Sequence, residues 1–304
     1  MSIPAAQPEV PPGVLLRRVT LASTVVAAVL IVVKLGAYVL TGSVAILSSL
    51  IDSILDSFAS LVNFFAVRQS LVPADADHRF GHGKAEPLAG LGQAAFIAGS
   101  SMLLLFEAGT RFITPVPVTH GVIGIAVMIF SLVLTIMLVA YQKYVISQTQ
   151  SLAVSADSLH YTSDVVLNLS VIVSIVLSVY AGWDAADPLF AIAIAGWIVY
   201  AAWGIARQSL DQLMDHELPD ADRERIRAIC LAHPEVRGVH ELRTRASGRD
   251  IFIQLHLVLG SGMLLAEAHR IAEGIEAELR TAFPAADVII HEDPVDDSRP
   301  APPG

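Results

Sequence analysis

Six apolar stretches dominate the sequence, and the shortest of them spans the 20 residues from Leu21 to Leu40. A helix rises 1.5 Å per residue, so a stretch of this length crosses a hydrocarbon layer about 30 Å thick. With 54% hydrophobic and only 16% charged residues, the chain is too apolar for an ordinary soluble domain. We therefore expect an α-helical membrane protein with six transmembrane helices, at residues 21–40, 44–69, 87–113, 119–145, 151–181 and 187–209.

Basic residues at one side of the six-span arrangement indicate its orientation. They are Arg17, Arg18, Arg68, Arg79, Lys84, Lys143 and Arg207. The positive-inside rule then places both termini in the cytoplasm. Arg17 and Arg18 before an apolar run are also typical of a cleaved secretory signal, including the twin-arginine kind, but the run is long and lacks a small-residue cleavage site. The net charge of −10 argues against a nucleic-acid partner.

The chain divides by composition into four segments. Residues 1–13 and 296–304 are rich in proline and predict a disordered leader and tail. Residues 14–210 form the six-helix transmembrane domain. Residues 211–295 predict a small α+β domain in the order α-β-β-α-β, with helices on one face of a three-stranded sheet and Asp220 as the N-cap of its first helix. Its expected elements are 219–231, 236–245, 251–258, 264–283 and 288–291.

Ionisable residues within two of the apolar stretches form polar stripes at helical spacing. The second stretch carries Ser49, Asp52, Asp56 and Ser60, and the fifth carries Asp157, His160, Asp164 and Asn168. Residues four apart lie on one helix face, and charges in a membrane are usually functional. If the two faces meet, Asp52, Asp56, His160 and Asp164 offer three oxygens and one nitrogen, which suits Zn²⁺ and tolerates Cd²⁺, Fe²⁺ or Co²⁺. The alternative is that the stripes only pair helices or line a proton path.

Further groups of metal-ligand type lie outside the apolar stretches. Asp75, His78 and His82 are close in one loop and are either a weaker metal site or incidental members of a solvated loop. The spacing of the histidines in the C-terminal domain favours structural roles. The single Cys230 excludes an internal disulfide and a thiolate cluster within one chain.

Four ordered motifs carry a resemblance over residues 14–295. They are Asp52-xxx-Asp56, Phe80-Gly-His-Gly-Lys-Ala-Glu86, His160-xxx-Asp164 and Ile290-His-Glu-Asp-Pro294. The chain resembles the cation diffusion facilitator (CDF) family, in particular its bacterial YiiP-like divalent-metal/proton antiporters. The resemblance implies a homodimer in the bacterial inner membrane that exports metal in exchange for protons, and no enzymatic activity. It makes Asp52, Asp56, His160 and Asp164 the transport site.

The resemblance also implies two further metal sites and a hinge. Asp75, His78 and His82 correspond to a second, weaker site. A metallochaperone-like cytoplasmic domain would hold a binuclear Zn²⁺ site made of His240, His256, His269, His291 and Asp293. Glu292 stands where some relatives have an amide. Lys84 and Asp215 resemble a charge interlock at the hinge between the membrane and cytoplasmic parts.

Two other functional classes stay open at this stage. A membrane metal sensor without transport would need the histidines of the soluble domain but no polar stripes. An intramembrane aspartyl protease would need one aspartate on each of two facing helices, to which the paired doublets fit less well. Lys34 and Glu107 either pair with each other within the membrane or reach the interface separately.

Overall fold

The computed structural model describes residues 10–113, 122–183 and 186–295, and the chain forms two compact units, Met1–Leu210 and Asp211–Gly304. Most of the expected leader and the expected tail lie outside the described residues. The last two residues of the expected leader already belong to a helix, because the first helix begins at Pro12. Proline is favoured at this position, because the N–H group that it lacks would have no hydrogen-bond partner within the helix.

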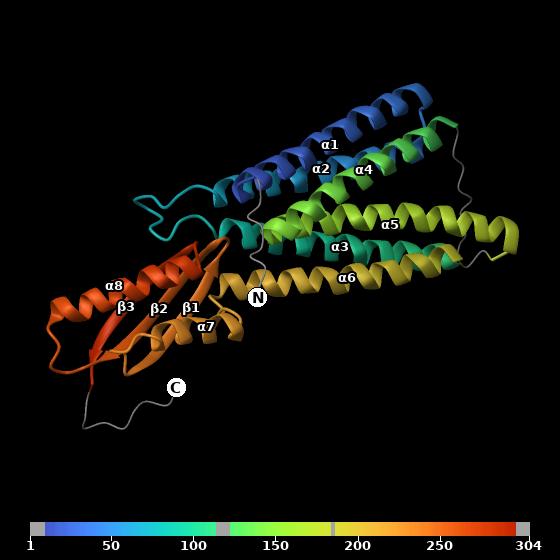
Figure 1. Ribbon diagram of the computed structural model, residues 1–304. Coiled ribbons are helices and arrows are strands. Elements are labelled where there is room, and N and C mark those ends of the chain that lie inside the picture. Colours follow the sequence, from blue (N-terminus) through green and yellow to red (C-terminus); the bar gives the residue numbers. More distant parts are fainter. Residues whose placement is uncertain (1–9, 114–121, 184–185, 296–304) are drawn as a thin grey trace. The chain divides into compact units, whose positions relative to one another are not determined.

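The first unit consists of six long helices (Figure 1). They are α1 (Pro12–Thr41), α2 (Val44–Ser70), α3 (Ala85–Ile113), α4 (Val122–Thr149), α5 (Leu152–Ala181) and α6 (Ala186–Leu213). Five of the six contain a segment long and apolar enough to cross a membrane, and the sixth, α5, begins with the polar stretch around His160. The expectation of a helical transmembrane domain is confirmed.

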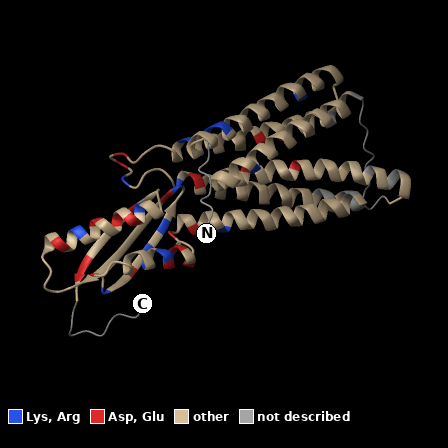
Figure 2. Ribbon diagram, in the orientation of Figure 1, with Lys and Arg blue, Asp and Glu red and all other residues tan. Residues whose placement is uncertain are grey.

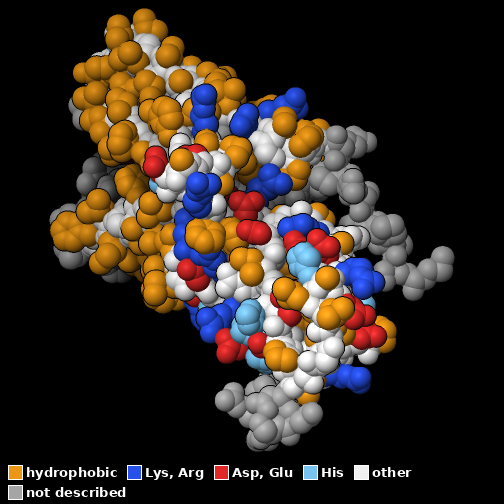
Figure 3. Space-filling model, turned by 90° about the vertical axis from the view of Figure 1, so that its left-hand side faces the viewer, with side chains coloured by type: hydrophobic (Ala, Val, Ile, Leu, Met, Phe, Trp, Pro, Cys, Tyr) orange, Lys and Arg blue, Asp and Glu red, His pale blue; other side chains and the backbone are white. Residues whose placement is uncertain are grey.

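The surface of this helical unit is apolar. Charged side chains are sparse along its helices (Figure 2), and hydrophobic side chains cover its visible face in the space-filling view (Figure 3). Many large apolar side chains point outward, among them Val39, Phe58, Met102 and Tyr200, each more than two-thirds exposed. Such a surface is stable in a hydrocarbon layer and would aggregate in water.

Two tight connections fix how the helices carrying the polar stripes are placed. Between α1 and α2, Gly42 adopts a left-handed conformation at φ +62°, and its N–H bonds to the Tyr38 carbonyl. Between α4 and α5, Gln150 is left-handed at φ +51°, and the Ser151 hydroxyl accepts a hydrogen bond from the Val154 N–H. This serine satisfies a free N–H at the start of α5, immediately before the stretch that bears His160.

Buried apolar clusters hold the bundle together at several levels. Leu16, Val67, Val145 and Val154 join α1, α2, α4 and α5 near the ends where Arg17, Arg68 and Lys143 lie. A second cluster packs α3, α5 and α6 around Ile97 and Ile198. The helices that carry the polar stripes are therefore fixed by packing on both sides.

The second unit contains α7 (Asp220–Leu231), β1 (Gly238–Ser247), β2 (Asp250–Leu259), α8 (Leu265–Ala282) and β3 (Ala286–Pro294). The sheet order is β1-β2-β3, with β1 antiparallel and β3 parallel to β2. The expected α-β-β-α-β order is confirmed. The prediction of Asp220 as an N-cap is wrong: Pro219 precedes the helix, and Asp220 is its first residue and pairs with Arg223 at 3.1 Å.

The core of the second unit lies between its sheet and its helices. Alternate residues of β2, such as Ile253, Leu255 and Leu257, are buried against α8 residues such as Ile275 and Leu279. The period of two in β2 and of three to four in α8 makes one face of each element apolar. The residues that alternate with the buried ones, His256 among them, face away from this core.

Candidate metal centre

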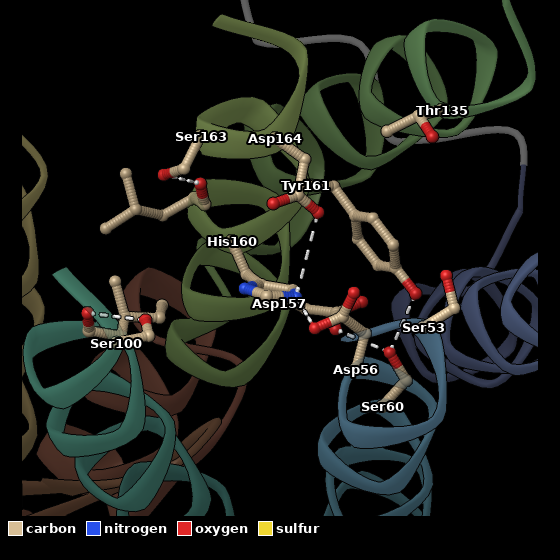
Figure 4. A network of polar contacts seen from close by, with 12 residues as sticks. Ser53, Asp56, Ser60, Ser100, Thr135, Asp157, His160, Tyr161, Ser163 and Asp164 are labelled. Carbon is tan, nitrogen blue, oxygen red and sulfur yellow. Dashed lines mark hydrogen bonds and ion pairs between the residues drawn. The ribbon is translucent and has the colours of Figure 1, made fainter. Parts of the chain in front are cut away.

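The polar stripes of α2 and α5 meet within the helical unit. His160 Nε2 lies 2.9 Å from Asp56 Oδ1 and 3.9 Å from Asp164 Oδ2, and the three ligand-type atoms lie within 4.8 Å of one another. Figure 4 shows His160 reaching from α5 toward Asp56 on α2, with Asp164 one turn along. We call Asp56, His160 and Asp164 the helical cluster. Helices far apart in the sequence thus bring two carboxylates and one imidazole together.

The imidazole of His160 has the character of a free ligand. Only 7% of the residue is exposed, and among the described residues its buried Nε2 makes no hydrogen bond of acceptable geometry, although Asp56 Oδ1 is 2.9 Å away. A buried polar atom without a hydrogen bond is costly. A ring nitrogen that faces two carboxylates offers one nitrogen and two oxygen ligands to a divalent cation.

Asp52, the fourth residue expected at this site, is not within the close group. It lines the same cavity of about 230 Å³ as Asp56 and Asp164, together with Ser49 and Asn168 of the two stripes. Since a water molecule takes up about 30 Å³ in the liquid, this volume holds several waters or a hydrated ion. The structure therefore brings together three of the four expected residues and leaves Asp52 at the wall of the adjoining cavity.

Lys34 of α1 also lines this cavity, which the sequence did not indicate. Its Nζ donates hydrogen bonds to the Ser49 carbonyl at 3.1 Å and to Ser53 Oγ at 2.6 Å. The side chain of Glu107, its expected partner, lies outside the described residues. A fixed cation therefore stands in the same cavity as three carboxylates.

The loop residues Asp75, His78 and His82 form a second group. Asp75 Oδ1 is 3.5 Å from His78 Nδ1, and Asp75 Oδ2 is 3.4 Å from His82 Nε2. The same carboxylate accepts the N–H groups of Asp77 and His78, and the His78 N–H is the main reason that the pKa of Asp75 lies below its usual value. We call these residues the loop cluster. Asp75 and His78 are largely exposed, so this cluster is open to solvent.

A third group lies across the sheet of the second unit. His240, His256 and His291 occupy one rung, since His256 pairs with His240 on β1 and with His291 on β3. Asp293 Oδ2 is 3.1 Å from His240 Nε2 and 2.8 Å from His256 Nδ1, and Asp293 Oδ1 is 3.2 Å from His291 Nε2. We call these four residues the sheet cluster. Figure 3 shows histidines among acidic and basic side chains on the visible face of this unit.

The electrostatics of the sheet cluster centre on Asp293. Partial burial alone raises the pKa of this carboxyl, but the hydrogen bond with His256 and the charges of His256, His291 and His240 outweigh it. The pKa of Asp293 consequently lies below its usual value, so the carboxylate is ionised at neutral pH. An ionised oxygen shared by several imidazoles is a suitable bridging ligand.

His269 does not join the sheet cluster within one chain. Its Nε2 is 3.4 Å from Glu273 and its Nδ1 is 3.9 Å from Glu292. Glu292, which the sequence marks as unusual, thus contacts the one expected ligand that stands apart. The fifth residue of the expected binuclear site lies on α8 beside a carboxylate of β3.

The proposed interlock of Lys84 and Asp215 stays a prediction, because the two residues belong to different units. Within the second unit, Asp215 has a left-handed backbone at φ +57° and pairs with Arg245 at 3.2 Å. Arg245 in turn lies over the Phe252 ring at 4.5 Å. Asp215 is therefore anchored to the sheet through β1.

Comparison with known proteins assigns both units. Residues 20–214 match the cation efflux transmembrane domain, and residues 218–295 match the cytoplasmic domain of cation efflux proteins. The chain belongs to the cation diffusion facilitator family. The resemblance drawn from the four motifs is confirmed, and the protein is a multi-pass membrane transporter for divalent cations and not an enzyme.

Individual relatives cover nearly the whole of this transporter. The cation-efflux pump FieF of Cronobacter sakazakii is 48% identical over 282 residues, which are 93% of this chain and 94% of the relative. The cation-efflux pump FieF of Shewanella oneidensis is 48% identical over 274 residues, covering 90% and 92%. A solved chain of CzrB in a Zn form is 34% identical, covers 28% of this transporter and 99% of that chain, and has a TM-score of 0.27.

Proposed function

We propose that this transporter exports Zn²⁺ from the cytoplasm across the bacterial inner membrane in exchange for protons. The observation that carries the proposal is the helical cluster, in which α2 and α5 supply ligands to one point beside a polar cavity. Ligands divided between two helices need both helices in place. Movement of one against the other would therefore release the ion, as alternating access requires.

The donor set supports zinc over the lighter divalent cations. Asp56 and Asp164 supply hard oxygens and His160 a borderline nitrogen, a combination common in tetrahedral zinc sites. Mg²⁺ and Ca²⁺ prefer shells of oxygen alone and higher ligand numbers. Asp52, which lines the same cavity, is the natural fourth ligand after a rotation of its side chain. Cd²⁺, Fe²⁺ and Co²⁺ are secondary substrates by the same argument.

Exchange against protons follows from the same residues. Metal binds only to deprotonated carboxylate and neutral imidazole, so protons and metal compete for one set of atoms. Imidazole groups ordinarily titrate near pH 6.5, between a neutral cytoplasm and a more acidic exterior. Protons arriving from outside would displace the metal, and metal arriving from inside would displace the protons.

The other two clusters fit roles at the membrane surface and in regulation. The open loop cluster suits weak capture or sensing of Zn²⁺. The sheet cluster offers three imidazoles and a carboxylate, a donor set that holds Zn²⁺ well. In a homodimer of these domains, a resident Zn²⁺ there would link cytoplasmic zinc to the assembly of the transporter. His269 and Glu292 would take part if the dimer completes their surroundings.

Zinc flux into proteoliposomes tests the proposal. Vesicles with an imposed pH gradient should accumulate Zn²⁺ through the wild-type transporter, and collapse of the gradient should stop accumulation. Asp56→Ala should abolish flux. The matched control is Asp287→Ala, which changes an exposed carboxylate of β3 outside the three clusters and should leave flux intact.

Each alternative gives a different result in the same assay. Bound Zn²⁺ without flux would identify a metal sensor. Flux that ignores the pH gradient would remove proton exchange from the proposal. Unaltered flux in Asp56→Ala would show that the helical cluster is not the transport site.

A further inference from the structure

One buried carboxylate of α5 belongs to none of the three clusters. Asp157 is 1% exposed and lies one turn before His160 on the same helix. Its Oδ1 accepts hydrogen bonds from Ser60 Oγ at 3.2 Å and Gln93 Nε2 at 3.2 Å, and its Oδ2 accepts one from Gln142 Nε2 at 2.8 Å. Three neutral donors on three other helices thus hold one carboxylate in the middle of the bundle.

Two more contacts extend this arrangement to all five of the helices α1–α5. Gln142 Nε2 also lies 3.0 Å from Ser23 Oγ on α1, and Ser60 Oγ shares a hydrogen bond of 2.9 Å with the Tyr161 hydroxyl. Figure 4 shows Tyr161 reaching from beside Asp164 to Ser60, with Asp157 close to His160. We call Ser23, Ser60, Gln93, Gln142, Asp157 and Tyr161 the Asp157 network.

The network and the polar cavity are adjacent along the bundle, and Tyr161 belongs to both. The cavity is lined by later residues of α1 and α5, such as Lys34 and Asn168, and by an early residue of α2, Ser49. The network uses an earlier residue of α1, Ser23, and a later residue of α2, Ser60. Since α1 and α2 run in opposite directions through a short turn, these positions separate along the bundle axis.

The end occupied by the network is the one with the basic residues. Arg17 lies in the second turn of α1, Arg68 in the last turn of α2 and Lys143 in the last two turns of α4. By the positive-inside rule, this is the cytoplasmic end. The polar cavity therefore lies on the outer side of the helical cluster, and the Asp157 network and the apolar cluster of Leu16, Val67 and Val154 lie on its cytoplasmic side. A second cavity of about 840 Å³ between α2 and α3, lined by Arg68 and Gln93 among others, reaches the network from the cytoplasmic end.

The network is not fully satisfied. The amide oxygens of Gln93 and Gln142 are buried and have no hydrogen-bond partner among the described residues, because their amide nitrogens face the carboxylate. The same holds for Asn63, whose Nδ2 donates to the Ala153 carbonyl. Each such oxygen destabilises the closed arrangement. A closure that leaves several acceptors unpaired is held together mainly by its charged centre and opens readily when that centre is lost.

We propose that Asp157 is a positioning residue that closes the cytoplasmic side of the transport path by gathering hydrogen-bond donors from α2, α3 and α4. This proposal rests on the proposed function, because the path that Asp157 closes is the path of the metal ion. Asp157 is not one of the three residues of the helical cluster, and in this state donors from three helices hold both of its oxygens. The metal enters from the cytoplasm only after the donors of Ser60, Gln93 and Gln142 have separated from it.

Site-directed thiol labelling tests this closure. In a Cys230→Ala background, Ala153→Cys places a thiol at a fully buried position one turn on the cytoplasmic side of Asp157, and Ser49→Cys places one in the outer cavity. A charged, impermeant methanethiosulfonate reagent is applied to inside-out vesicles for the first and to right-side-out vesicles for the second. Adding Asp157→Asn should speed modification of Ala153→Cys about tenfold, as expected for the loss of one hydrogen bond to a charged group, and should slow modification of Ser49→Cys.

Ser101→Ala is the matched control. This serine is also buried, but within the described part of the chain its hydroxyl bonds to the Ile97 carbonyl of its own helix and to no member of the Asp157 network. Both labelling rates should stay at the wild-type value. Ser60→Ala provides a second test with a smaller change, since it removes one donor and the link to Tyr161, and it should move both rates in the same directions as Asp157→Asn.

These experiments test the proposed closure and the proposed transport function independently of each other. If folded Asp157→Asn and Ser60→Ala proteins are labelled at the same rates as the protein without these substitutions, the proposed closure is overturned, whatever the flux assay shows. Loss of one bound Zn²⁺ per chain in Asp157→Asn, measured by titration calorimetry, would make Asp157 a ligand and would also overturn it. Absence of zinc flux in the wild type would contradict the proposed function, while the labelling rates would still decide whether Asp157 closes this side of the bundle.

Discussion

His160 Nε2 and Asp56 Oδ1 lie 2.9 Å apart, although 103 residues separate them in the sequence. The contact joins α5 to α2 at the level of the cavity that Asp52 and Lys34 line. A small rotation of either helix would separate the nitrogen from the oxygen. The affinity for a cation at this point is therefore tied to the packing of two particular helices.

Replacing the nitrogen ligand should change which metal is carried. In His160→Asp the site would consist of carboxylates alone, which favours harder cations such as Mn²⁺ over Zn²⁺. We expect the ratio of Zn²⁺ to Mn²⁺ flux in proteoliposomes to fall by about tenfold or more, comparable to the roughly 10–100-fold cost of altering an outer-shell partner. His216→Asp, at an exposed position in the second unit, is the control. An unchanged ratio would show that the imidazole does not select the metal.

Removing the fixed cation from the cavity should strengthen metal binding. The ammonium of Lys34 shares its cavity with Asp52, Asp56 and Asp164, so it repels a divalent cation there. Lys34→Met should raise Zn²⁺ affinity by about tenfold, given the size of charge interactions in partly buried sites. Titration calorimetry measures this change. Lys143→Met, which removes an exposed lysine from α4, should leave the affinity unaltered, and a weaker affinity in Lys34→Met would contradict the repulsion.

The sheet cluster should make the second unit sensitive to acid. Because the pKa of Asp293 is lowered in the folded state, its ionised form stabilises the fold above the unfolded pKa of about 3.9, and this stabilisation is lost as pH falls through the folded value. In chelator-treated wild-type protein, the amide hydrogens of β3 should therefore exchange faster at pH 3 than at pH 5.5, once the exchange rates are corrected for their intrinsic dependence on pH. In Asp293→Asn this pH-dependent difference should be smaller. An equal difference in exchange rate between the two pH values in both proteins would show that Asp293 does not contribute to the stability of this unit.

Cys230 should be chemically silent in the folded protein. It is fully buried in the core of the second unit, and burial raises the pKa of its thiol to about 12. Thiols react as thiolates, so a disulfide reagent at pH 8 should modify Cys230 only after unfolding. Ser261→Cys, at an exposed turn, should react within the mixing time under the same conditions. Rapid modification of Cys230 in the native protein would contradict its burial.

The helical cluster was largely predictable because its information is local. The spacing of Asp52 and Asp56, and of His160 and Asp164, fixes one face on each helix, and the membrane leaves few partners for such faces. Sequence spacing could not show that Asp52 stands back from the other three. It also gave no sign that Lys34 faces this cavity, because a lysine toward the end of a span usually reaches the interface.

The spacing of residues in the sequence could not predict how the sheet cluster comes together. From the turn at Gly248, β1 and β2 pair so that an uninterrupted ladder would place His240 opposite Leu257. A bulge at Glu241, whose backbone is left-handed at φ +48°, shifts the register and places His240 opposite His256 instead. One residue of shift exchanges the two faces of a strand. Spacing alone therefore favoured structural roles for these histidines, and the family resemblance supplied the expected ligand set.

The parallel pairing of β3 with β2 sets the order in which the sheet cluster can form. His291 and Asp293 lie on β3, which is synthesised after β1, β2 and α8 and pairs with β2 across that helix. Pairing between strands so distant in the chain forms late in folding. We therefore expect His240 and His256 to come together on the β1–β2 hairpin before the carboxylate that joins them is in place. A divalent cation held by all four residues would thus mark a finished domain.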